Sequence, residues 1–231
     1  MKFSKSTLAI LKNFASINPG IVLAPGDLVM TRSIDNAVYA ETTIDDVIDA
    51  DMNIYDLNGF LGAISLVGET SSVNVDNING LNTIVIESSK TTAYWPLDHK
   101  NSIIHPKKQI VFPSPCVEFE LSSDNLGYIM KLSRGLGVDT LVITNDDGKL
   151  ILNGYNKVTD GKMVKKLFTQ ELGEYAGDNT FKFVLDVVNL KIIQDDYKVL
   201  LWAKDKNAAV KFKGNTASYV IALNLETTHD F

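Results

Sequence analysis

Four aspartates within seven residues, Asp45, Asp46, Asp49 and Asp51, form the first group in this sequence with the composition of a chemical site. Paired carboxylates bind Mg²⁺, or act as general acid and base, when a fold brings their oxygens together. Adjacent residues of an extended segment point to opposite faces, however, and no histidine or lysine is placed as a catalytic partner. We therefore expect a solvated acidic edge, and an enzyme that uses this cluster stays a hypothesis to test.

The other reactive residue types are sparse. The histidines His99, His105 and His229 have no second histidine or cysteine at the spacing of a zinc site. The only cysteine, Cys116, follows a proline at the start of a predicted strand, where a free cysteine usually packs as a small buried side chain. One cysteine excludes an internal disulfide and fits a reducing cytoplasm. The sequence predicts no catalytic residue, metal or cofactor, and we interpret the protein as a binding protein.

The remaining residues that indicate a function are the cations on predicted helices. Lys5 and Lys12 are seven residues apart on a helix predicted over Ser4–Ile17, and Lys131 and Arg134 are three apart on a second helix that ends near Gly135. In both helices the apolar residues recur every three or four positions on the other side. One basic helix face is ordinary, but its repetition in a chain of net charge −6 predicts a cationic surface that contacts phosphates without reading base sequence.

Each of these helices is followed by a predicted β-hairpin. The hairpins comprise residues 28–43 and 141–152, and the Asp-Gly pair at 147–148 between β-branched runs is a strong hairpin signal. Superposing Asp35-Asn36 on Asp147-Gly148 places the two copies about 112 positions apart. The chain is therefore expected to contain two copies of one module.

Further elements follow in a similar order in each half. A helix predicted over residues 54–67 has two interior glycines, Gly59 and Gly62, which indicate either a weak helix or close approach by another body. A short helix over 187–193, which carries Lys191, takes the corresponding place in the second half. The tail 226–231 is polar and is expected to be mobile. Strands are predicted at 73–81, 83–87, 93–96, 116–121, 162–172, 180–185, 197–204, 208–213 and 218–225.

Composition and proline content set the domain organisation. An apolar fraction of 45% predicts a soluble globular protein, and no apolar run reaches the length of a membrane span. Lys12 and Asn13 interrupt any signal-peptide core. Residues 97–115 hold three of the six prolines and read as a linker. We expect domains at 1–110, including most of this linker, and 111–231, in the α+β class with mostly antiparallel sheets covered on one side by helices.

Six stretches spread over the chain are characteristic, namely Ile10–Ala15, Ile54–Gly62, Ser133–Leu136, Asn153–Val158, Leu200–Lys204 and Thr228–Phe231. Taken together, they resemble the sliding clamps of T4-like bacteriophages, the polymerase processivity factors. The resemblance implies the DNA-clamp fold, with two similar domains per chain, helices on an inner face and antiparallel sheets outside. It implies that three chains close into a ring around duplex DNA, with no catalytic site.

The same resemblance implies partners. They are the chain itself as a homotrimer, duplex DNA, the replicative DNA polymerase, an ATP-dependent clamp loader, and a phage late sigma-like factor with its co-activator. It places the protein in the cytoplasm of the infected bacterial host, with no membrane partner. A non-encircling, peptide-binding scaffold of the same fold is the alternative.

Site residues are carried over by position. The resemblance implies a DNA-facing lumen formed by Lys5, Lys12, Lys131, Arg134 and Lys191. It also implies a pocket for short hydrophobic partner peptides near the linker. Residues of this kind would equally serve as core between sheets, so both interpretations stay open. The pocket candidates are Ile110, Val111, Phe112 and Pro113 in the linker, with Tyr219 and Leu223 in the last strand.

Overall fold

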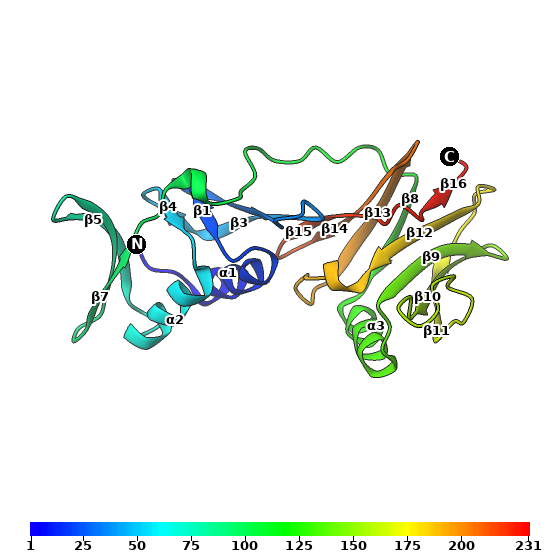
Figure 1. Ribbon diagram of the computed structural model, residues 1–231, viewed down its shortest axis with the longest axis horizontal. Coiled ribbons are helices and arrows are strands. Elements are labelled where there is room, and N and C mark those ends of the chain that lie inside the picture. The colour runs from blue at the N-terminus through cyan, green and yellow to red at the C-terminus, as the bar shows by residue number, and fades with distance from the viewer. The chain divides into compact units, whose positions relative to one another are not determined.

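The computed structural model describes residues 1–231, which divide into two compact units, Met1–Ile110 and Val111–Phe231 (Figure 1). Each unit combines antiparallel strands with one or two α-helices, which confirms the α+β class. None of the helices has the length and apolar character needed to cross a lipid bilayer.

Unit 1 contains two helices and short antiparallel pairings. The helices α1 (Lys5–Ile17) and α2 (Leu57–Val67) pack against each other, and α1 also covers part of β3 (Figure 1). Pairs form between β1 (Ile21–Leu23) and β4 (Met52–Ile54), and between β2 (Gly26–Arg32) and β3 (Val38–Ile48). A meander follows, made of β5 (Ser72–Ile78), β6 (Leu81–Glu87) and β7 (Thr92–Pro96), and a 3₁₀ turn η1 (Lys100–Ser102) begins the linker.

A cap and an apolar stripe fix α1. The Ser4 side chain accepts the Thr7 N–H at 3.2 Å, which satisfies one of the free donors in the first turn. Ile10, Phe14 and Ile17 are buried at spacings of four and three, so one side of the helix faces the core. The opposite side is consequently left to solvent.

Unit 2 contains one long helix and two antiparallel sheets. The helix is α3 (Ser123–Leu136), and a 3₁₀ turn η2 (Val187–Asn189) follows β12. One sheet has the order β8-β13-β14-β15, with β8 (Val117–Leu121), β13 (Tyr197–Lys204), β14 (Asn207–Gly214) and β15 (Ser218–Ala222). The other has the order β11-β10-β9-β12-β16, with β9 (Thr140–Asp146), β10 (Lys149–Tyr155), β11 (Phe168–Glu174), β12 (Phe181–Asp186) and β16 (Thr228–His229).

The core of unit 2 lies between its two sheets and α3. A small cavity of about 30 Å³ at its centre is lined only by apolar side chains, among them Leu126 of α3, Ile143 of β9 and Val199 of β13. Burial of such side chains is the main favourable term in folding. It holds the buried side of α3 inward and leaves its cationic side outward.

The two units repeat part of their strand pairing, but the predicted superposition of the hairpins is wrong by one strand. A short strand that the sequence did not reveal, β1, follows α1 and pairs with β4, as β9 follows α3 and pairs with β12. The next hairpins are β2–β3 and β10–β11, so β2–β3 corresponds to β10–β11 and not to β9–β10. The three residues of β1, which lies between Gly20 and Pro25, are too few to show a strand period.

Two predicted elements of unit 2 differ from the structure. Where a helix over 187–193 is expected, only the turn η2 forms, because Asp186 provides no side-chain cap and two β-branched valines begin the segment. The strand expected over 162–172 runs instead over β11. Residues 156–167 form a loop in which Asp160 accepts the N–H groups of Val164 and Lys165 at 2.7 and 2.6 Å.

The tail is ordered, contrary to expectation. Thr228 and His229 form β16, which pairs with β12. The Phe231 ring stacks against Phe181 and Phe183, with centroids 5.7 and 6.3 Å away. The polar composition of residues 226–231 concealed the effect of one aromatic side chain, which gains apolar contact only once the sheet exists.

Candidate nucleic-acid interface

The exposed side of α1 carries small and cationic side chains. Lys5, Ala9, Lys12 and Ser16 are all exposed and follow one another at spacings of four, three and four residues. They therefore form one stripe along the helix. No acidic residue lies in α1, so the helix itself has no carboxylate that would offset the charges of Lys5 and Lys12.

The exposed side of α3 is also cationic. Lys131 and Arg134 are exposed, and neither is part of an ion pair within the chain. Asp124 in the first turn and Arg134 in the last turn both complement the helix dipole. The two cations border an open hollow of about 610 Å³, which also involves Met130, Leu190 and Ile192. Unit 2 thus presents two unpaired positive charges beside a recess.

Lys191 lies in the segment that forms the opposite wall of this hollow, but it does not lie on a helix. Its side chain is half-buried, and its backbone N–H donates to the Asn189 carbonyl at 2.8 Å. The segment approaches α3 closely at Gly127, where a Cβ atom would lie 2.9 Å from Nε2 of Gln194. The structure therefore brings the Lys191 segment together with Lys131 and Arg134 in unit 2.

The second helix of unit 1 has no cation, and its two glycines differ in their surroundings. Gly62 faces open space, whereas a Cβ at Gly59 would lie 2.8 Å from Cη2 of Trp95 and would clash with the Asp56 carboxylate. Asp56 caps the helix by accepting the Gly59 N–H at 2.9 Å. Close approach thus explains Gly59, while Gly62 adds a flat, uncharged patch to the exposed side of α2.

The acidic cluster has a structural use. Asp46 accepts the backbone N–H of Ser4 at 2.7 Å, and Asp49 lies 3.4 Å from the amino group of Met1. Burial of Asp46 opposes ionisation, but hydrogen bonds from Thr7 and Ser4 outweigh it and lower the pKa of this carboxyl. The aspartates thus hold the residues before α1 against β3. No set of three or more His, Cys, Asp or Glu side chains is arranged to hold a metal ion.

The surroundings of Cys116 make its thiol unreactive. The Sγ of Cys116 is half-buried and donates to the Leu201 carbonyl at 3.3 Å. Burial raises the pKa of this thiol, so the reactive thiolate is disfavoured.

The residues predicted to form a partner pocket fall into two groups, which differ in their exposure to solvent. Ile110, Val111 and Pro113 are exposed, with 91% of Val111 accessible, and Phe112 and Leu223 are half-buried. These positions offer apolar surface to a partner. The predicted last strand is also shorter, since β15 ends at Ala222.

Tyr219 does not belong with them. Its side chain is fully buried, its ring meets Tyr197 edge-on at 6.3 Å, and its hydroxyl accepts the Ile193 N–H at 3.3 Å. Burial raises the pKa of Tyr219, as expected for a phenol without water around it. Tyr219 is therefore a core residue of unit 2, and the prediction that it lines an open pocket is wrong.

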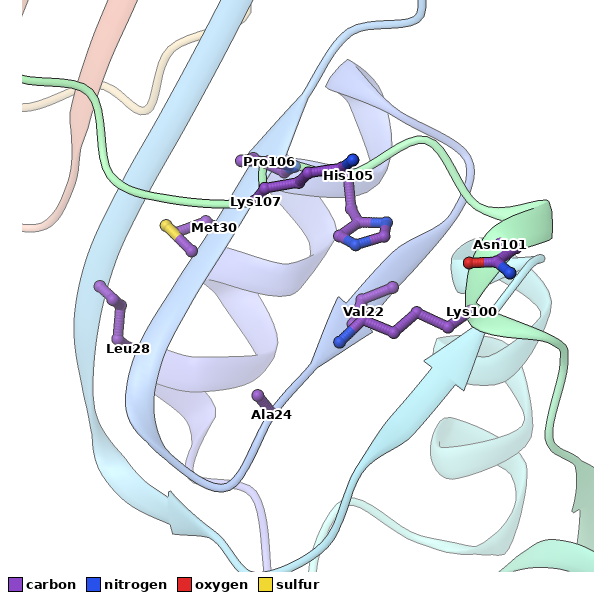
Figure 2. Close-up of a pocket in the computed structure, with 9 residues that line it drawn as sticks. All are labelled: Val22, Ala24, Leu28, Met30, Lys100, Asn101, His105, Pro106 and Lys107. Carbon is purple, nitrogen blue, oxygen red and sulfur yellow. The ribbon is translucent and has the colours of Figure 1, made fainter.

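A hollow that the sequence did not predict lies at the linker in unit 1 (Figure 2). It has a volume of about 390 Å³ and is lined by β1, β2 and the linker residues Lys100, Asn101, His105, Pro106 and Lys107. Leu28 and Met30 are half-buried and lie on one face of β2, whereas in the sequence they belong to the continuous apolar run Leu28-Val29-Met30, which has no alternation to mark that face.

Comparison with known proteins decides the family. Residues 2–105 match the family model "DNA polymerase processivity factor", and residues 118–225 match "gp45 sliding clamp, C terminal". The chain is 43% identical to the sliding clamp of Enterobacteria phage T4 and 44% identical to that of Escherichia phage RB69. Each match covers 231 residues and 100% of both chains. The chain belongs to the sliding-clamp family.

More distant sliding clamps share the fold. The PCNA of A. fulgidus, in a structure with the C-terminal region of FEN-1, superposes with a TM-score of 0.65 at 11% identity over 96% of both chains. The H. pylori beta clamp gives a TM-score of 0.66 at 14% identity over 94% of this chain and 63% of that one. The two-domain α+β clamp fold is thus confirmed, together with the function of a sliding clamp and polymerase processivity factor.

Proposed function

We propose that three copies of this sliding clamp close into a ring around duplex DNA, with each compact unit acting as one clamp domain. The observation that carries the proposal is the full-length match to phage sliding clamps. The ring would tether the replicative DNA polymerase without catalysing a reaction itself. An ATP-dependent clamp loader would open and close it in the cytoplasm of the infected host.

Two open sheet edges support ring assembly. In unit 1 the outer edge of β5 is occupied, since the Val73 N–H donates to the Met1 carbonyl at 2.8 Å, whereas β7 has no strand beyond it. In unit 2 the edge strand β11 likewise has no further neighbour. Unpaired edges offer rows of N–H and C=O groups to another chain. Pairing β7 of one copy with β11 of the next gives a head-to-tail interface, which makes a ring when the rotation closes.

The cationic helix sides support DNA contact. Lys5 and Lys12 of α1 and Lys131 and Arg134 of α3, with Lys191 beside them, would face the duplex. Phosphate contacts of exposed lysines are loose and independent of sequence, which suits a ring that must slide. The chain as a whole has a net charge of −6, so DNA is disfavoured elsewhere on the surface.

Partner docking is proposed at the exposed linker. Ile110, Val111, Phe112 and Pro113, with Leu223, would contact short hydrophobic peptides of the polymerase and of the clamp loader. A late sigma-like transcription factor and its co-activator would use the same surface. The PCNA structure that holds the C-terminal region of FEN-1 shows that a peptide docks on a protein of this fold.

Retention on DNA tests the ring. The clamp is loaded onto a nicked circular plasmid by a cognate clamp loader, and bound protein is measured before and after the plasmid is cut once. We expect the wild-type protein to stay on the circle and to leave the linear form. Retention on the linear form equal to that on the circle would contradict encirclement and would favour a scaffold that only binds peptides.

Charge reversal tests the proposed DNA-facing residues. The double variant Lys12→Glu, Lys131→Glu should lower the amount of clamp that is loaded onto circular DNA about tenfold, since each ring loses several phosphate contacts. The matched control Lys204→Glu, Lys206→Glu reverses two exposed lysines at the β13–β14 turn and should bind as the wild type does. Equal losses in both variants would mean that overall charge, and not a lumen, governs binding.

A further inference from the structure

An aromatic side chain lies among the charged residues on the exposed side of α3. The outermost stripe of this helix consists of Asp124, Tyr128, Lys131 and Gly135, at spacings of four, three and four residues, and all four are exposed. Residues at these spacings are neighbours on a helix surface. The Tyr128 side chain is 55% accessible. Sliding along duplex DNA needs the cations of this stripe but gives no reason for the ring.

Tyr128 has no partner within the chain. Its hydroxyl makes no hydrogen bond, and its ring belongs to none of the aromatic pairs of either unit. The rings of Phe14 in α1 and Phe60 in α2 are buried, so Tyr128 is the only exposed aromatic residue on an α-helix of this protein. A Cβ atom at Gly135 would meet nothing within 4 Å, so the surface beyond Lys131 is open.

The charges beside the ring are arranged on one side of it. Lys131 follows Tyr128 by three residues and Arg134 follows it by six, and neither forms an ion pair. Asp124 lies one turn before Tyr128 and repels anions. Phosphates are therefore attracted only to the C-terminal side of the ring, and a strand bound at Lys131 and Arg134 passes next to the phenol.

The corresponding stripe of α1 has charge without a ring. Ala9 lies between Lys5 and Lys12 at the place that Tyr128 takes before Lys131. The two helices can therefore both contact phosphates, but only α3 offers an aromatic face. This difference assigns any contact with a base to unit 2.

We propose that Tyr128 stacks on an unpaired base of single-stranded DNA while Lys131 and Arg134 hold the phosphates next to that base. Bases inside a duplex are paired and stacked on one another, so a ring beside the duplex reaches only sugar and phosphate. An exposed ring next to unpaired cations is the combination by which proteins bind single strands without reading sequence. The inference rests on the proposed function, in which this side of α3 faces DNA, and extends it to single strands.

Three fluorescent DNA probes of equal length separate the two contacts. They are an oligothymidylate, the same strand with an abasic site in place of every thymidine, and a duplex. Fluorescence anisotropy at low salt measures their affinities for the full-length chain. Tyr128→Ala should weaken the binding of oligothymidylate about fivefold and should change the binding of the other two probes by less than about twofold. Tyr128→Phe keeps the ring and should retain most of the affinity for oligothymidylate.

Two further variants are the controls. Lys131→Gln removes a charge, keeps the ring and should weaken the binding of all three probes. Leu136→Ala removes an exposed apolar side chain from the same helix and should change no affinity by more than about twofold. The proposal is overturned if Tyr128→Ala loses as much affinity for the abasic strand as for oligothymidylate, if Leu136→Ala shows the same loss, or if Lys131→Gln binds oligothymidylate as the wild type does. A wild type that binds oligothymidylate no better than the abasic strand would also overturn it.

The outcome is distinguishable from that of the ring. Tyr128→Ala should keep the solution mass of the wild type and its retention on circular duplex DNA. If Tyr128→Ala binds oligothymidylate as the wild type does, and the wild type stays on the circle but leaves the linear plasmid, the stacking proposal is wrong and the clamp proposal stands. If the wild type stays on the linear plasmid while Tyr128→Ala loses affinity only for oligothymidylate, the reverse holds.

Discussion

At the scale of single residues, the two glycines of α2 make a matched pair. Gly59→Ala should destabilise unit 1 by about 1–3 kcal/mol, because the added methyl group meets Trp95 and the capping Asp56 carboxylate. Gly62→Ala meets nothing and should stabilise the helix by up to about 1 kcal/mol. Thermal unfolding of the two variants measures both effects. An equal rise of Tm in the two would contradict the close contact at Gly59.

Asp139 gives a prediction for acid stability. Burial of Asp139 opposes ionisation, but the N–H groups of Lys157 and Val158 at 2.7 and 3.1 Å and the Thr140 hydroxyl outweigh it and lower its pKa. A lowered folded-state pKa stabilises the protein above the ordinary value of 3.8, and this stability is lost as pH falls through the folded pKa. Between pH 5 and 3, about the range where aspartate titrates, the Tm of Asp139→Asn should therefore fall less than that of the wild type. An equal fall of Tm in Asp139→Asn and in the wild type over this pH range would show that other carboxyl groups determine the acid stability.

At the scale of elements, β16 and Phe231 close the five-stranded sheet of unit 2. Phe231→Ala removes the stacking on Phe181 and Phe183 and should cost about 1–3 kcal/mol. Phe231→Leu keeps the apolar surface and should cost less. Calorimetry should show that Phe231→Ala lowers the Tm of unit 2, while the enthalpy of unfolding stays close to that of the wild type. An unchanged Tm for Phe231→Ala would mean that the tail contributes little to the sheet.

At the scale of the whole molecule, the open edge of β7 determines assembly in our proposal. Light scattering should give a mass of about 76 kDa for the wild type, three times 25.4 kDa, at micromolar concentration. Tyr94→Asp, at an exposed site on the edge strand, should give the monomer mass at the same concentration. Leu81→Asp changes an equally exposed apolar residue at the β5–β6 turn and should remain a trimer. A wild-type monomer at high micromolar concentration would contradict the ring.

The local features of the chain followed from its sequence. Ser4 and Ser122 cap helices whose apolar residues recur every three or four positions, and the cations lie on the outer sides of both helices as predicted. A helix closes its hydrogen bonds within a few residues, so spacing and caps describe it almost completely. The resemblance to the family likewise depended on contiguous stretches of the sequence.

What the tertiary structure decided involves partners far apart in the chain. The strand β1 exists because Ile21 pairs with Ile54, and the tail is ordered because Phe231 meets Phe181 and Phe183. The hollow at the linker likewise needs β1, β2 and residues 100–107 together. A strand obtains its hydrogen bonds from another segment, and a hollow obtains its walls from several, so neither leaves a period or motif at any one place in the sequence.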